Sequence, residues 1–83
     1  MKVLYFAWVR ERIGLAEEEI SLPHDVETVA DLVEWLAARG EAYAAAFANR
    51  KGVRAALDRT HAPPQTAIGS AREIAFFPPM TGG

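Results

Sequence analysis

The sequence contains no cysteine, so neither a disulfide nor a zinc–thiolate site can hold this fold together. A chain of 83 residues has room for one domain, which must then be stabilised by a single apolar core. Apolar residues make up 51% of the sequence, which is enough for such a core. We therefore expect one small domain with no metal site and no thiol nucleophile.

Charge and hydropathy argue against two classes of partner. The formal net charge is −2, whereas domains that bind nucleic acid usually carry a strongly basic face. No stretch of the sequence approaches the roughly 20 apolar residues that a membrane-spanning helix needs. The sequence begins directly with strand-like residues, so we expect no signal peptide and a cytoplasmic location. We thus expect neither nucleic acid nor a membrane as a partner.

The first part of the chain is typical of a β-hairpin. Residues 3–9 are rich in aromatic and β-branched side chains, and residues 17–22 alternate between polar and apolar until Pro23. A loop over residues 10–14 is expected to join the two strands. Both faces of the first strand are apolar, so we expect one of them to meet a partner. The inward set is predicted to be Val3, Tyr5 and Ala7, and the outward set Leu4, Phe6 and Trp8.

Two helices and further strands are predicted after the hairpin. Thr28 is expected to cap the main helix with Asp31 in a capping-box position, and Gly40 is expected to end it. The buried stripe of this helix is predicted to be Val29, Leu32, Val33 and Leu36. A shorter helix is predicted over residues 41–48, and strands over residues 53–58, 66–68 and 73–77. This order predicts an α+β roll, in which a mixed sheet of four to five strands carries the main helix on one face.

The sequence ends with the motif Phe-Phe-Pro-Pro-Met-Thr-Gly-Gly. Its two prolines fix φ at about −65° and have no N–H, so the chain is expected to leave the last strand as a stiff stem. Gly82 and Gly83 lack Cβ atoms that would crowd the terminal carboxylate. Small residues also gather at frayed termini, but the strand and stem before them favour a functional end. We predict a domain over residues 1–77 and a flexible tail over residues 78–83 that presents Gly83 as an acyl group.

Two motifs in this chain resemble the family of molybdopterin synthase small subunits, which are sulfur carriers with a ubiquitin-like, β-grasp fold. The first motif is Phe-Ala-Trp-Val-Arg-Glu at residues 6–11, followed by Gly14. The second covers residues 74–83, and the order of predicted elements agrees with the family over the whole chain. The chain departs from the family before the last strand, where Ser70-Ala71-Arg72-Glu73 replaces a common Asp-Gly-Asp-Glu turn.

The resemblance implies a sulfur carrier that is not catalytic alone. An E1-like adenylating enzyme would use ATP to activate Gly83, and a sulfur donor would convert it to a thiocarboxylate. The large subunit of molybdopterin synthase would then pass this sulfur to cyclic pyranopterin monophosphate to build the molybdopterin dithiolene. No permanently bound cofactor is implied. The implied reactive residues are Gly82 and Gly83, and the implied partner-binding residues are Phe6, Phe77, Pro78, Pro79, Met80 and Thr81.

Three alternative functions remain open from the sequence. The chain could carry sulfur for another pathway, such as that of the thiamine thiazole, or it could be a ubiquitin-like modifier that forms isopeptide bonds with lysines. It could also be an interaction module whose Gly-Gly end has no role. His24 and His61 lie in proline-bearing sequence without ligand spacing, so we expect neither to bind a metal or act in catalysis.

Overall fold

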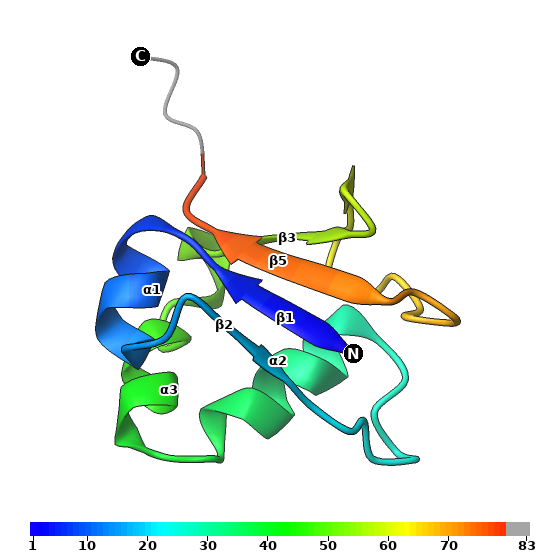
Figure 1. The fold of residues 1–83 in the computed structure, drawn as a ribbon, viewed down its shortest axis with the longest axis horizontal. Helices are drawn as coiled ribbons and strands as arrows, with labels where there is room; N and C mark the ends of the chain where they lie inside the picture. Colours follow the sequence, from blue (N-terminus) through cyan, green and yellow to red (C-terminus); the bar gives the residue numbers. More distant parts are fainter. Residues whose placement is uncertain (80–83) are drawn as a thin grey trace.

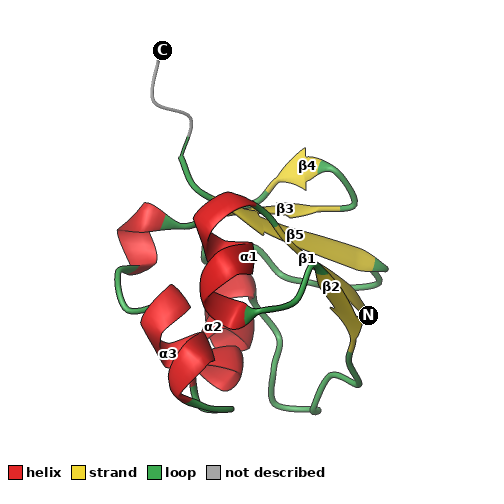
Figure 2. Ribbon diagram, turned by 60° about the vertical axis from the view of Figure 1, so that its left-hand side comes forward, coloured by secondary structure: helices red, strands yellow, loops and turns green. Residues whose placement is uncertain are grey.

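The computed structural model describes residues 1–79, which form a mixed five-stranded sheet with three α-helices on one face (Figures 1 and 2). The strands are β1 (Lys2–Tyr5), β2 (Glu17–Glu19), β3 (Arg54–Leu57), β4 (Thr60–His61) and β5 (Glu73–Phe77). The helices are α1 (Ala7–Ile13), α2 (Val29–Ala37) and α3 (Glu41–Ala46), and a 3₁₀ turn, η1, spans Arg50–Gly52. The strand order is β2-β1-β5-β3-β4, with β1 and β5 parallel and the other three pairs antiparallel. This arrangement confirms the predicted α+β roll.

One apolar core lies between the sheet and the helices. Val3, Tyr5, Ile74 and Phe76 of the two central strands are almost completely buried. The helices contribute a second set of buried side chains, Val9, Ile13, Leu32, Leu36 and Ala46. The ring of Phe76 stacks on Tyr5 with 6.2 Å between centroids and meets Phe47 edge-on at 5.1 Å. The burial of Val3 and Tyr5 confirms the predicted phase of β1.

The first strand is shorter than predicted, and helix α1 occupies the rest of that segment and most of the predicted loop. Val9 and Ile13 are four residues apart, so one face of a helix buries both against the core. Gly14 ends the helix in the left-handed region with φ at 89°, where the absence of a Cβ avoids a clash. Ala7 and Trp8 therefore belong to a helix rather than to a strand, and Trp8 packs against the core from α1.

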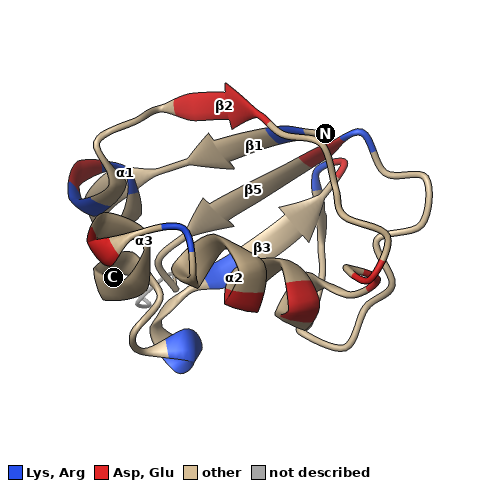
Figure 3. Ribbon diagram, turned by 90° about the horizontal axis from the view of Figure 1, so that it is seen from below, with Lys and Arg blue, Asp and Glu red and all other residues tan. Residues whose placement is uncertain are grey.

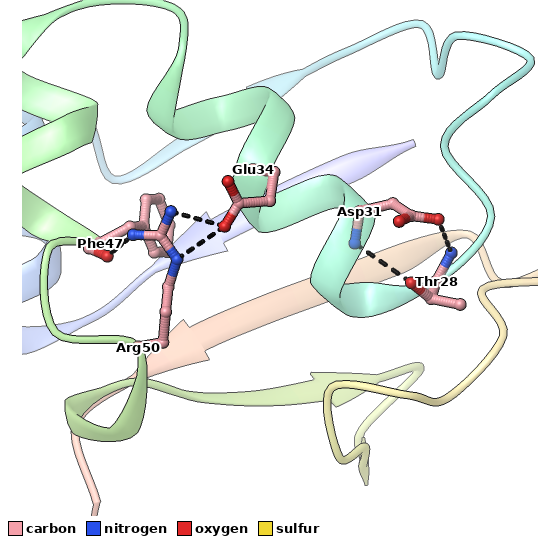
Figure 4. Close-up of polar contacts among 5 residues, drawn as sticks. All are labelled: Thr28, Asp31, Glu34, Phe47 and Arg50. Carbon is pink, nitrogen blue, oxygen red and sulfur yellow. Dashed lines mark hydrogen bonds and ion pairs between the residues drawn. The ribbon is translucent and has the colours of Figure 1, made fainter.

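The capping box that begins α2 is confirmed (Figure 4). The Thr28 hydroxyl accepts a hydrogen bond from the Asp31 N–H, and the Asp31 carboxylate accepts one from the Thr28 N–H, each at 3.1 Å. Hydrogen bonds from the backbone N–H groups of Glu27 and Thr28 hold the pKa of Asp31 below its ordinary value. The prediction that Gly40 ends this helix is wrong. Helix α2 already ends at Ala37, and Gly40 is extended, with φ at 167°, before α3.

The remaining elements follow the predicted order with small differences. β5 has the predicted bounds, β2 and α3 end earlier than predicted, at Glu19 and Ala46, and β3 is one residue shorter at each end. In the predicted stripe of α2, three residues are buried and Val33 is half-buried. The strand predicted over residues 66–68 is reduced to a single bridge between Thr28 and Ala67, because the prolines before it donate no hydrogen bonds to a ladder.

The short strand β4 was not predicted, and a tight turn at Asp58 and Arg59 creates it. Both residues have positive φ, at 45° and 71°, so the chain reverses directly after β3. The Asp58 carboxylate accepts hydrogen bonds from the N–H groups of Arg72 and Glu73, both at 3.0 Å. These bonds fix the start of β5 at the place where the sequence departs from the family's usual turn.

Candidate functional site

The candidate site lies where β5 ends and the two prolines follow. Phe77 is the last residue of β5, and Pro78 and Pro79 come directly after it, all three half-buried. The Phe6 N–H donates to the carbonyl oxygen of Phe76 at 3.0 Å, so Phe6 lies beside this strand end. The side chain of Phe6 is 47% exposed. Four of the predicted partner-binding residues are therefore gathered at one end of the sheet.

The reactive end that the sequence predicted lies outside the described residues, as do two of the predicted partner-binding residues. These four positions are Met80, Thr81, Gly82 and Gly83. The predicted tail over residues 78–83 can thus be followed only through its two prolines. The described part of the site is the surface from which the chain continues.

The sheet face opposite the helices carries a row of half-buried apolar side chains. In the strand register, Leu4 of β1 lies opposite Ala75 of β5, and Ala75 lies opposite Ala56 of β3. Phe77 shares this face, since it is two residues beyond Ala75, and it lies opposite Arg54. No helix formed by residues 1–79 covers this face (Figure 2). Leu4 and Phe77 thus have the outward orientation that the sequence predicted, and we call this row the open face.

Charged side chains occupy the other end of the open face. Lys2 of β1 lies opposite Glu19 of β2 and Glu73 of β5. The Lys2 ammonium is also 3.4 Å from the Glu17 carboxylate. The open face is therefore charged at the start of β5 and, apart from Arg54, apolar near the end of β5. The apolar part of the open face therefore lies beside the point where the chain leaves the sheet.

A partly buried polar cluster, which the sequence did not predict, ties strand β2 to the helices. The Glu18 carboxylate accepts hydrogen bonds from the hydroxyls of Tyr5 at 2.8 Å and Tyr43 at 2.7 Å, and it pairs with Arg39 at 2.9 Å. Burial alone would raise the pKa of Glu18, but the three donors outweigh burial and hold the pKa below its ordinary value. Burial and the same carboxylate raise the pKa of both tyrosines. Because all four side chains are paired with one another, we assign this cluster a structural role.

The two histidines are placed apart in the chain and are both exposed. His24 lies in the loop before α2, and His61 lies in β4. Among residues 1–79, no group of three or more histidine, cysteine, aspartate or glutamate side chains could hold a metal ion. No helix in this part of the chain is long and apolar enough to cross a membrane. The described part of the candidate site consists of the apolar side chains at the end of β5.

Comparison with known proteins places this chain in a family. Residues 3–83 match the model of the ThiS family. The chain is 40% identical to the molybdopterin synthase sulfur carrier subunit of Haemophilus influenzae and 37% identical to that of Escherichia coli. Each comparison extends over 83 residues, which are 100% of this chain and 99% of the relative.

Solved structures resemble this fold closely. A protein of Pyrococcus furiosus, provisionally described as molybdopterin converting factor, subunit 1, matches with a TM-score of 0.74 and 28% identity over 95% of each chain. SAMP1 from Haloferax volcanii matches with a TM-score of 0.72 and 24% identity, covering 100% of this chain and 98% of its own. At that identity, the second likeness concerns the fold alone. Together they confirm the β-grasp fold that the sequence predicted.

Proposed function

The chain belongs to the ThiS family, and from this premise we propose that it is the sulfur carrier subunit of a molybdopterin synthase. The observation that carries the proposal is its identity of 40% over full length to a carrier subunit of that enzyme. Its sequence also ends in Gly82-Gly83, which supplies an uncrowded terminal carboxylate. The proposed partners are the large subunit of the synthase and an E1-like enzyme that activates the carboxylate.

The first proposed step activates Gly83. A carboxylate is ionised at neutral pH and is therefore a poor electrophile. In the E1-like partner, a carboxylate oxygen of Gly83 attacks the α-phosphate of ATP, so that an acyl-adenylate forms and pyrophosphate leaves. A sulfur donor then supplies sulfur at the oxidation level of hydrosulfide, HS⁻, which attacks the acyl carbon; AMP leaves with the electron pair of the broken C–O bond, and the S–H proton is lost to solvent. The product is a thiocarboxylate at Gly83.

The second proposed step delivers the sulfur. In the large subunit, the thiocarboxylate sulfur forms a bond to a carbon of cyclic pyranopterin monophosphate, and the C–O bond at that carbon breaks, so that its oxygen leaves with the electron pair and takes up a proton. Water then cleaves the acyl–sulfur bond, which leaves the sulfur on the pterin and restores the Gly83 carboxylate. Two such deliveries supply both sulfur atoms of the dithiolene. ATP is consumed by the activating partner, and the carrier itself holds no permanent cofactor in this cycle.

The described residues support this role as a docking platform. The apolar end of the open face includes Leu4, Ala75 and Phe77 and lies where β5 ends. Pro78 and Pro79 have no N–H, so neither can donate a hydrogen bond that would extend the ladder beyond Phe77. Both partners must reach the same terminal group, and we propose that they use this same surface in turn.

Two alternatives can be separated from the proposal by observation. The two curated relatives are molybdopterin synthase subunits, which favours that pathway over thiamine thiazole synthesis. A ubiquitin-like modifier would form conjugates in which Gly83 is joined to lysine side chains. Their isolation from the native host, with no thiocarboxylate at Gly83, would support the modifier instead.

The proposal predicts that deletion of Gly83, or an extension beyond it, abolishes molybdopterin synthesis and leaves the fold intact. The reason is that the reactive group is lost, while the core formed by residues 1–79 is unchanged. A reconstitution assay with the large subunit measures the first effect, and thermal unfolding measures the second. Gly40→Ala is a matched control, because a Cβ at that extended position meets no atom within 4 Å. Full activity of a chain with an extension that stays uncleaved would contradict the proposal.

A further inference from the structure

A concave surface lies on the helix side of the sheet, between α2 and the edge of the sheet formed by β3 and β4. It encloses a volume of about 540 Å³, within the range of roughly 300–1,000 Å³ that is usual for binding pockets. Its lining includes Val33 of α2 and Val53 before β3, which are half-buried, and the buried rings of Phe47 and Phe76 pack beneath them. We call this surface the basic groove because of the charges that line it.

The basic groove has a positive rim although the chain as a whole is acidic. Three of the nine lysines and arginines of the sequence line it, namely Arg50, Lys51 and Arg54, and among the described residues Glu34 is its only acidic one. Glu34 is already neutralised, since its Oε1 lies 2.7 Å from Nη2 and 3.1 Å from Nε of Arg50 (Figure 4). Among residues 1–79, Lys51 and Arg54 form no ion pair. Figure 3 shows the basic positions between α3 and the start of β3, the acidic positions of α2 beside them and the acidic strand β2.

Arg50 also fixes the shape of the groove. Its guanidinium bonds the carbonyl oxygen of Phe47 in addition to the Glu34 carboxylate, so one side chain joins η1, the end of α3 and α2 (Figure 4). The backbone adds a second tie, because the Ala30 N–H of α2 donates to the Pro64 carbonyl at 2.8 Å. A groove that is held open before binding loses less conformational freedom when it is filled.

We propose that the basic groove binds an acidic peptide segment of a partner protein, which inserts one large apolar side chain. The apolar lining selects the inserted side chain, and a carboxylate beside it would meet Lys51, while Arg54 offers a second cation at the border with the open face. Arg54 lies opposite Phe77 in the strand register, so the groove adjoins the open face. A protein docked on the open face can therefore reach the groove with a neighbouring segment. This inference goes beyond sulfur transfer and does not depend on it.

The test uses the isotope-labelled full chain and a ten-residue peptide of aspartate and glutamate with one central phenylalanine. Saturable shifts are expected for the backbone amides of Val33, Val53 and Ala55 in nuclear magnetic resonance spectra. A peptide with alanine in place of phenylalanine is expected to bind at least about tenfold more weakly. Lys51→Glu should weaken binding of the phenylalanine peptide about fivefold, whereas the matched charge reversal Arg72→Glu, outside the groove, should leave it unchanged.

A steric pair of variants tests the inserted side chain. Ala30 is exposed and lines the groove, so Ala30→Phe should block insertion while the chain stays folded. Ala42→Phe, on the exposed side of α3 and outside the groove, is the matched control. Thermal unfolding of both variants tests whether each keeps the fold, and we expect a cooperative transition for both. Absence of saturable shifts, equal binding of the alanine peptide, or unchanged binding by Ala30→Phe would overturn the proposal.

Discussion

The two faces of the sheet are built from alternate residues of the same strands, yet they differ in burial. On the helix side, Val3 and Phe76 are both 0% exposed. On the open face, Leu4, Ala75 and Phe77 remain half-buried, since no helix of the described residues covers them. Phe76 and Phe77 make this comparison between neighbours in one strand. The difference indicates that the buried face stabilises the fold, and it supports our proposal that a partner binds the other face.

The largest effect on the fold is expected for Phe76→Ala. Phe76 stacks on Tyr5 and meets Phe47 edge-on, so its removal leaves a cavity in the centre of the core. We expect a loss of about 3–5 kcal/mol in the free energy of unfolding, measured by denaturant titration. Phe77→Ala is the matched control and should lose clearly less. Equal losses for the two variants would remove the distinction between the faces.

Phe77→Ala should instead weaken binding to the large subunit, by on the order of 2 kcal/mol. The reason is that an outward aromatic side chain beside the departing chain end is suited to anchor a partner. Titration calorimetry measures the affinity, and denaturant melts measure the smaller loss of stability. If the variant unfolds while its surviving folded fraction binds normally, then Phe77 belongs to the core and the faces are wrongly assigned.

Glu18→Gln should destabilise the domain by about 1 kcal/mol at neutral pH, because the charged acceptor of three hydrogen bonds is lost. The pKa of Glu18 is lower in the folded than in the unfolded chain, so the unfolded chain binds more protons in acid. The contribution of Glu18 is therefore complete above its ordinary pKa of about 4.3 and is lost as the pH falls through the lower, folded value. Denaturant melts of the wild type and of Glu18→Gln between neutral and acidic pH measure this loss of stability.

The exposed neighbour Glu17 provides the control for this pH dependence. Its carboxylate contacts only the ammonium of Lys2 at 3.4 Å among the described residues, and its side chain is 56% exposed. Glu17→Gln should therefore change stability by at most a few tenths of a kcal/mol. The difference between the two variants should shrink in acid. A difference that stays constant from neutral pH to strong acid would show that Glu18 does not titrate as described.

Much of the fold could be predicted because local signals agree with long-range packing. The Thr28–Asp31 capping box and the alternation in β5 both specify their elements without help from distant residues. The sequence did not predict helix α1, because the aromatic and β-branched residues at the start of the chain favour a strand. The pair Val9 and Ile13 and the stop at Gly14 were the signals for a helix, and burial against the core decides in their favour.

The candidate site was predictable only where sequence neighbours form it. Phe77 and the prolines adjoin one another in the chain, so their grouping follows from the sequence. The Glu18 cluster joins β1, β2, α3 and the end of α2, and the basic groove joins α2, η1, β3 and β4. Both depend on contacts between distant segments, which residue spacing does not reveal. A charged residue at an inward position of a strand, as at Glu18, was the one available signal.

The intact mass of the protein purified from its own host tests the central claim most directly. We predict a population that is heavier by the difference between one sulfur and one oxygen atom, with the change located at Gly83 by fragmentation. A chain that lacks Gly83 should show no such population. The Haemophilus influenzae relative, expressed in the same host, serves as a reference carrier. Exchange on that relative, with only the unmodified mass for this chain, would contradict its assignment as a sulfur carrier.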